Sequence, residues 1–324
     1  METMANHNIK KLVAIRGGAM GDFILTLPAI NALRSRFPHA HMSLIGNPSL
    51  LSLAQADGIF DHNSALFTLL YTHSGEFSPA TRKIFEDVDL LLAYSVDPDG
   101  VFANRLNSLV KGRVIVFDPR PSPQSESHII DHLLEPLHLC GIPVLHTLPK
   151  LNEEFIDRGY ALQTNQLNCF SKPLVVIHPG SGGRHKRWPL NHFIKLINNL
   201  TDQAVQVAVS VGPAEATMLQ ELTAKLPISC PVLAAPGIPQ LAGLLESADL
   251  FIGNDSGPSH LAAALETPTL VLFGPTNPQT WSPRGTSVRV LQAPTGNLKA
   301  LEIDSVQKAI YAQLAQNGMR DGRK

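Results

Sequence analysis

Residues 174–189 read LVVIHPGSGGRHKRWP. The first four are apolar and rich in β-branched side chains, which predicts a buried strand over 174–177. A glycine-rich loop follows, and Pro189 suits the first turn of a helix that we expect over about 189–200. The same order occurs near the start of the chain, where residues 11–22 read KLVAIRGGAMGD. Two such strand–turn–helix units predict two parallel α/β domains.

The remaining periodicity fits two α/β halves of similar length. In the first half we expect strands over 11–15, 41–45, 88–94 and 114–117, with helices over 24–33 and 131–140. In the second half we expect strands over 174–177, 204–211, 250–252 and 269–273, with helices over 189–200, 214–226, 241–247, 256–265 and 303–316. The predicted organisation is a first domain over 1–150, a linker over 151–172, a second domain over 173–302 and a C-terminal segment over 303–324.

The composition excludes several classes of protein. The 324 residues carry 26 Lys and Arg against 27 Asp and Glu, for a net charge of −1, whereas a nucleic-acid-binding protein usually has a strongly basic face. The 44% of hydrophobic residues is too high for a disordered chain. Three widely spaced cysteines form neither a disulfide framework nor a zinc pattern. We therefore expect a soluble, cytosolic, globular protein that binds no nucleic acid, and we expect a monomer.

The sequence shows no signal for membrane insertion. The first ten residues are polar, and no apolar run approaches the roughly 18 residues that a membrane span needs. Peripheral contact with the inner membrane is the one membrane role that stays open, because such contact leaves a weak trace in a sequence.

Residues 16–22 (RGGAMGD) form the turn after the first predicted strand. Gly18 and Gly21 let backbone N–H groups approach a ligand, and the start of the next helix favours an anion. The spacing G-x-x-G-D is neither the dinucleotide-binding fingerprint nor a Walker A loop. From these residues alone, Asp22 is either the N-cap of the helix or a catalytic carboxylate.

The turn over 178–189 is the most basic of the strand-to-helix turns. Three glycines, Ser181 and the cations Arg184, Lys186 and Arg187 precede Pro189. The dipole of a helix start disfavours cations, so this composition is better explained by a bound phosphate than by a solvated loop. The net charge of residues 161–324 is +3, against −4 for residues 1–160, which agrees with an anionic ligand in the second half.

The turn over 253–260 (GNDSGPSH) ends a strand and opens a helix. Asp255 or Ser256 can cap that helix, and the amides of Ser256 and Gly257 can face an anion. Taken alone, His260 in the first helical turn is a structural residue more often than a functional one.

Together these turns resemble glycosyltransferase family 9, the ADP-heptose:lipopolysaccharide heptosyltransferases, over about residues 11–285. The resemblance lies in Gly21-Asp22, in 179–181 with 186–189, in 255–265, in Pro268 and in 273–276. It implies a GT-B fold of two Rossmann-like doubly wound domains that face a central cleft, with the acceptor in the N-terminal domain and the ADP-sugar in the C-terminal one. It also implies that the last helix, within 303–324, crosses back to the first domain.

The resemblance assigns roles to individual residues. Asp22 falls on the position of the catalytic base, and Lys186 on that of the lysine that faces the phosphates of the departing ADP. Gly18 and Gly21 lie in the loop near acceptor and donor. The resemblance also implies ADP-sugar contacts from Ser181, Gly182, Arg187, Glu215 (ribose), Asp255 (donor sugar), Ser256, Gly257 and His260. It implies a metal-independent inverting transferase without a cofactor, acting on a lipopolysaccharide core or another glycan.

Other interpretations stay open at this point. The fold can serve another nucleotide sugar, a sugar-nucleotide epimerase or a non-catalytic sugar-nucleotide-binding module. Residue 19 is Ala where the family often has a polar side chain, and any of Arg184, Lys186 and Arg187 can meet the phosphate. Acceptor contacts are expected from the loops over 47–79 and 97–120, which hold no recognisable motif. Asp97-Pro98-Asp99 is expected to be a turn, and His128 and His132 are expected to be structural.

Overall fold

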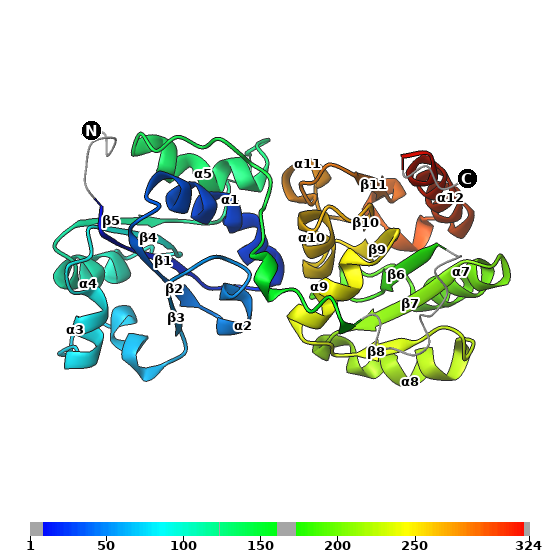
Figure 1. The fold of residues 1–324 in the computed structure, drawn as a ribbon, viewed down its shortest axis with the longest axis horizontal. Helices are drawn as coiled ribbons and strands as arrows, with labels where there is room; N and C mark the ends of the chain where they lie inside the picture. Colours follow the sequence, from blue (N-terminus) through cyan, green and yellow to red (C-terminus); the bar gives the residue numbers. More distant parts are fainter. Residues whose placement is uncertain (1–8, 123, 161–172, 321–324) are drawn as a thin grey trace. The chain divides into compact units, whose positions relative to one another are not determined.

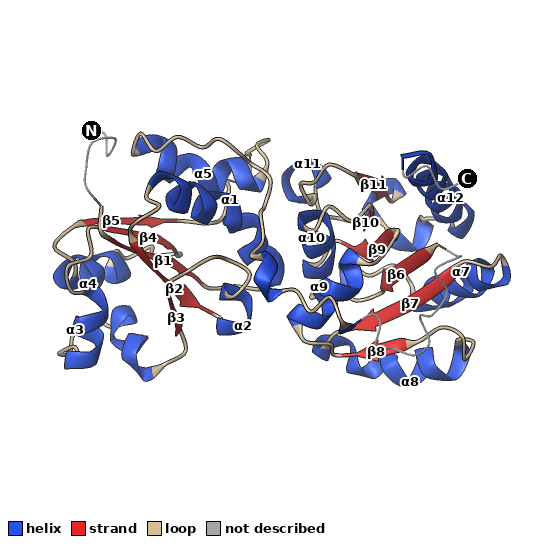
Figure 2. Cartoon of the chain, in the orientation of Figure 1, coloured by secondary structure: helices blue, strands red, loops and turns tan. Residues whose placement is uncertain are grey.

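The computed structural model describes residues 9–122, 124–160 and 173–320, which form two compact units over 1–153 and 154–324, each built on its own parallel sheet (Figures 1 and 2). The boundary between the units falls inside the predicted linker, and residues 161–172 of that linker lie outside the described residues. Among the described helices, none is both long and apolar enough to cross a bilayer.

The first sheet has the strand order β3-β2-β1-β4-β5, and all neighbouring strands are parallel. Its strands are β1 (Lys11–Arg16), β2 (His41–Gly46), β3 (Gly58–Asp61), β4 (Leu90–Tyr94) and β5 (Arg113–Phe117). Its helices are α1 (Met20–Arg36), α2 (Pro48–Leu51), α3 (Pro79–Phe85), α4 (Val101–Leu109) and α5 (Ile129–Leu139), with a 3-10 helix at Ala65–Tyr71.

Helices cover both faces of this sheet because its central strands are apolar on both sides. Val13 and Ile15 of β1 pack with Phe85 of α3 and Phe102 of α4 in one buried cluster. On the other face α1 and α5 lie side by side (Figure 1). Alternate residues of one buried strand thus pack into two hydrophobic layers, as expected for a parallel sheet.

The second sheet has the order β11-β10-β9-β6-β7-β8, again with parallel neighbours. Its strands are β6 (Leu174–His178), β7 (Gln206–Val211), β8 (Val232–Ala234), β9 (Leu250–Asn254), β10 (Thr269–Phe273) and β11 (Val288–Gln292). Its helices are α7 (Leu190–Asp202), α8 (Ala216–Lys225), α9 (Ile238–Glu246), α10 (Gly257–Ala264), α11 (Pro278–Trp281) and α12 (Ile303–Arg320).

The last helix, α12, belongs to the core of the second unit. Val306, Ala309 and Ile310 are buried in the same cluster as residues of α7 and of the central strands. The expected crossing of this helix to the first domain stays a prediction, since these contacts lie within one unit.

The strand order indicates where a ligand is expected to bind at each sheet. In each sheet the chain first adds strands on one side of the first strand and then adds the later strands on its other side. The order therefore switches between β1 and β4 in the first sheet and between β6 and β9 in the second. Ligands of open parallel sheets bind beyond the carboxyl ends of the strands at such a switch point. The loops that follow these four strands are therefore where a site is expected.

Candidate functional site

Asn254, the last residue of β9, fixes the basic loop that follows β6. Its side-chain amide donates to the carbonyl oxygens of Pro179 (2.9 Å) and Gly180 (3.2 Å), and its Oδ1 accepts the N–H of Trp188 at 2.9 Å. The side chain is fully buried. One amide thus holds both ends of the loop over 179–188, so the residues between them project from a fixed frame.

Lys186 and Asp255 form an ion pair at this edge of the sheet. Lys186 Nζ lies 2.8 Å from Asp255 Oδ2, and the same oxygen accepts the hydroxyl of Thr276 at 2.8 Å. The Asp255 side chain is 7% exposed and the Lys186 side chain 29% exposed, so the cation is the partner that solvent can reach. Ser181 is buried beneath them and donates to the Asp255 carbonyl oxygen at 2.9 Å. The structure therefore brings Ser181, Lys186 and Asp255 together.

Arg187 points to a different partner, the buried carboxylate of Glu215. Arg187 Nε donates to the carbonyl oxygen of Ser181 at 2.7 Å, and its Nη2 lies 3.4 Å from Glu215 Oε1. A Cβ atom at Gly180 would overlap the Glu215 side chain, and one at Gly212 would lie 2.8 Å from Glu215 Oε2. Both positions therefore require glycine for the carboxylate to lie where it does. Arg184 is exposed, and Lys186 is the cation that forms the ion pair with Asp255.

The start of α10 presents backbone amides next to these side chains. Ser256 is the N-cap residue; its hydroxyl donates to Asn254 O at 3.3 Å and accepts no capping bond from the first helical turn. Gly257 opens the helix and His260 is buried within its first turn. Across the loop, Gly182 has nothing within 4 Å of the position of a Cβ atom. The arrangement can accept an anion with several oxygens at a helix start.

His178, the last residue of β6, lies under the loop and was missing from the predicted site. Its ring is buried and its Nδ1 lies 3.1 Å from Ser210 Oγ. Burial, with a smaller effect of the Arg187 charge, lowers the pKa of His178 to about 4. The ring is therefore neutral at pH 7, and it adds no positive charge beside Arg187.

This depressed pKa makes acid destabilise the second domain. The unfolded chain protonates His178 near its ordinary pKa of 6.5, while the folded protein does so only near 4. The contribution of neutral His178 to the free energy of unfolding is thus complete above about pH 6.5. It decreases by about 3 kcal/mol as the pH falls toward 4. Urea unfolding of wild type and His178→Gln at pH 7.5 and 4.5 should show the acid-induced loss reduced by that amount in the variant. Equal losses in both proteins would contradict it.

In the first domain, Asp22 is the third residue of α1, and Ala19 is the N-cap residue. The N-cap interpretation of Asp22 is therefore wrong in position: the carboxylate instead accepts the N–H of Ala19 through Oδ2 at 2.9 Å. Arg16 Nη2 lies 3.6 Å from Asp22 Oδ1, with Arg16 10% and Asp22 42% exposed at the side chain. Gly18 has φ +102°, and a Cβ atom there would lie 2.8 Å from Asp22 Oδ2. Gly21 is the second residue of α1.

Arg16 is a second residue that sequence reasoning missed. Its Nε donates to Thr26 Oγ1 at 3.0 Å, which holds the guanidinium beside Asp22. Burial lowers the pKa of Arg16, and the charge of Asp22 opposes that shift. The guanidinium of Arg16 therefore places a positive charge beside the carboxylate of Asp22.

The other motifs have structural roles. The carboxylate of Asp97 accepts the amides of Phe102 and Ala103 at the start of α4. His128 is the N-cap residue of α5 and accepts the N–H of Ile130 through Nδ1 at 3.1 Å. Among the described residues, no group of three or more His, Cys, Asp or Glu side chains could hold a metal ion. Cys140 and Cys230 are buried free thiols, and Cys169 lies outside the described residues.

Comparison with known proteins gives the family. Residues 117–310 match the model of glycosyltransferase family 9 (heptosyltransferase). The chain belongs to glycosyltransferase family 9. It is 35% identical to a lipopolysaccharide heptosyltransferase 3 of Escherichia coli over 293 residues, which cover 81% of this chain and 83% of that relative.

Two solved structures of family 9 members share the fold. A glycosyltransferase of family 9 from Veillonella parvula superposes with a TM-score of 0.75 at 18% identity, over 95% of this chain and 98% of that one. The E. coli ADP-heptose lps heptosyltransferase II superposes with a TM-score of 0.71 at 20% identity, over 95% and 99%. The two parallel α/β domains thus have the GT-B fold of this family.

Proposed function

We propose that this family 9 member is an inverting glycosyltransferase that moves a heptose from an ADP-activated donor to a lipopolysaccharide core or related glycan. The observation that carries the proposal is the cluster of Ser181, Lys186 and Asp255 beside the start of α10. We infer the heptose and the lipopolysaccharide from the names of the relatives. We infer the diphosphate from the chemistry of the cluster.

The second domain would hold the donor. Lys186 supplies a solvent-accessible positive charge, and Ser256 and Gly257 supply amides at a helix start, where an ADP diphosphate would be stabilised. His260 lies in the same helical turn, and Gly182 leaves the loop open for close approach. The buried carboxylate of Glu215, fixed by Arg187, suits a pair of ribose hydroxyls. Asp255 both orients Lys186 and offers oxygens to the donor sugar.

The first domain would hold the base. The acceptor hydroxyl attacks the anomeric carbon, its proton passes to the Asp22 carboxylate, and the bond from the anomeric carbon to the phosphate oxygen breaks. The electron pair of that bond stays on the ADP oxygen, which Lys186 stabilises. Attack from the face opposite the leaving group inverts the anomeric configuration. ADP is a good leaving group, so the step needs no second carboxylate acting as an acid, unlike glycoside hydrolysis.

A panel of nucleotides tests the donor assignment. ADP and ADP-heptose at about 100 times Kd should stabilise the chain by about 2.7 kcal/mol, which raises Tm by roughly 5 °C. UDP, GDP and CDP at the same concentration should bind weakly and should therefore shift Tm by only about 1–2 °C from the ligand-free value. Turnover should also persist in a chelator. A shift with UDP-sugars alone would contradict the proposal in favour of the other nucleotide-sugar enzymes of this fold.

A further inference from the structure

The turn over 273–276 (FGPT) ends β10, the neighbour of β9 in the second sheet. Because β10, β9 and β6 are adjacent and parallel, the loops that follow them leave the sheet at the same edge. Each loop brings one side chain to a shared contact: Lys186 follows β6, Asp255 follows β9 and Thr276 follows β10. Lys186 and Asp255 have roles in the proposed function, and Thr276 has none so far.

Both donors in this contact bind the same oxygen of Asp255. Lys186 Nζ and Thr276 Oγ1 each lie 2.8 Å from Oδ2. The Thr276 hydroxyl is the donor, because an ionised carboxylate only accepts hydrogen bonds. The other oxygen, Oδ1, accepts no hydrogen bond from the described residues and is not fully buried. Asp255 therefore keeps one oxygen available, although its side chain is only 7% exposed.

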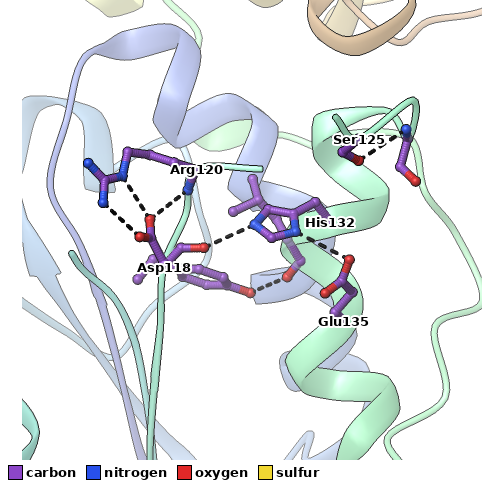
Figure 3. Close-up of polar contacts among 8 residues, drawn as sticks. Asp118, Arg120, Ser125, His132 and Glu135 are labelled. Atoms are coloured by element: carbon purple, nitrogen blue, oxygen red, sulfur yellow. Dashed lines mark hydrogen bonds and ion pairs between the residues drawn. The ribbon is translucent and has the colours of Figure 1, made fainter. Parts of the chain in front are cut away.

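Asp118 in the first domain shows the opposite arrangement of a carboxylate after a strand. Its Oδ1 accepts the Nε and the backbone N–H of Arg120 at 3.0 and 2.9 Å, and its Oδ2 accepts Nη2 at 2.8 Å (Figure 3). One arginine thus occupies both oxygens, as expected for a bidentate pair. At Asp255 two donors occupy one oxygen. That arrangement orients the carboxylate and leaves its other oxygen for a ligand.

Thr276 donates from a fixed position. Threonine is β-branched, so its short side chain has few orientations. The turn is also packed closely, because a Cβ atom at Gly274 would lie 2.9 Å from Leu298 Cγ. The next residue, Asn277, is the N-cap of α11 and accepts an N–H of that helix at 3.0 Å. The Thr276 hydroxyl therefore defines where Asp255 Oδ2 lies.

Lys186 alone would not fix this carboxylate. Its ammonium group is a point charge with three N–H donors on a flexible stem, so it can bond Asp255 and a phosphate oxygen at the same time and in several geometries. With this contact alone, the carboxylate could rotate about its last side-chain bond. The hydrogen bond from Thr276 is a second restraint on Oδ2, and it gives Oδ1 one direction.

We propose that Thr276 is a positioning residue for the donor sugar: its hydroxyl fixes the Asp255 carboxylate so that Oδ1 accepts a hydroxyl group of the sugar ring. This inference rests on the proposed function, in which Asp255 faces the sugar of an ADP-activated donor. It gives Thr276 no contact with ADP itself. Loss of the Thr276 hydroxyl should therefore weaken binding of the sugar and leave binding of ADP unchanged.

Calorimetry on the full chain with ADP and with ADP-heptose, without acceptor, tests the proposal. Thr276→Val keeps the shape of the side chain and removes its hydroxyl. It should bind ADP within about twofold of wild type. It should bind ADP-heptose about tenfold more weakly than wild type does, the low end for loss of one hydrogen bond to a charged group. Thr276→Ser keeps the hydroxyl and should bind ADP-heptose within about twofold of wild type.

Thr201→Val is the matched control, because Thr201 is also partly buried and its hydroxyl donates within α7, to the carbonyl oxygens of Ile197 and Asn198. It should bind both ligands as wild type does. A second test adds Thr276→Val to Asp255→Ala, and this addition should not weaken ADP-heptose binding further, because Thr276 acts through the carboxylate.

Three results would overturn the positioning role of Thr276. They are unchanged binding of ADP-heptose in Thr276→Val, an equal loss for ADP and ADP-heptose, and a further tenfold loss when Thr276→Val is added to Asp255→Ala. Failure of the proposed function gives a different result, since wild type itself would then bind no ADP-heptose.

Discussion

Asp22→Asn is expected to lower kcat for heptose transfer by about 100- to 10,000-fold, the range for loss of a general base, while the Kd for ADP stays within twofold. The asparagine Oδ1 can still accept the N–H of Ala19, so the start of α1 keeps its hydrogen bond. What the variant loses is the negative charge and the ability to take a proton. Transfer assays with ADP-heptose, beside calorimetry with ADP, measure the two effects separately.

Asp57→Asn is the matched control for this experiment. Asp57 pairs with Arg34 and accepts the N–H of Met42, as Asp22 pairs with Arg16 and accepts the N–H of Ala19. The two side chains are also similarly exposed, at 45% and 42%. The control should keep full activity. If Asp22→Asn retained more than a tenth of wild-type kcat, Asp22 would be a structural residue of α1 and not the base.

The central strands of both sheets were predictable from the sequence, whereas several edge strands were not. β1, β6 and β9 are short apolar runs that are buried on both faces, so their signal is strong. β3 alternates between partly buried and exposed residues, and β8 has three residues, so neither stands out from a loop. α4 was missed as well, since its N-cap residue is Gly100, with φ +68°, directly after a stretch that predicts only a turn.

The residues of the candidate site were likewise predictable from the sequence only in part. The glycine-rich loop composition and the resemblance to family 9 pointed to Ser181, Lys186 and Asp255, which do lie together. Asn254 was not recognised, because its role depends on partners such as Trp188, 66 positions away in the chain. Arg16 had a local signal, since it ends the strand just before Asp22, yet only the fold shows that the two side chains meet.

Lys186→Met is expected to reduce kcat/KM for ADP-heptose by about 100- to 1,000-fold, comparable to removal of one electrostatic group at a developing negative charge, and to weaken ADP binding. The substitution also leaves the buried Asp255 carboxylate without its cation, although the Thr276 hydroxyl still donates to it. An unpaired buried acceptor costs about 1–3 kcal/mol of folding stability. Loss of activity in this variant therefore has two candidate causes, missing charge and a weakened fold.

The double variant Lys186→Met/Asp255→Asn separates them. Removing the carboxylate together with its partner should bring the unfolding free energy back to within about 1 kcal/mol of wild type, while ADP binding stays as weak as in the single variant. Lys195→Met, on the exposed face of α7, controls for loss of a lysine in the same domain and should change neither quantity. If the double variant recovered wild-type affinity for ADP, Lys186 would serve only to neutralise Asp255, and the phosphate would have to be held by the amides of α10. Persistent weak binding in a stable protein would instead place the phosphate-facing charge on Lys186.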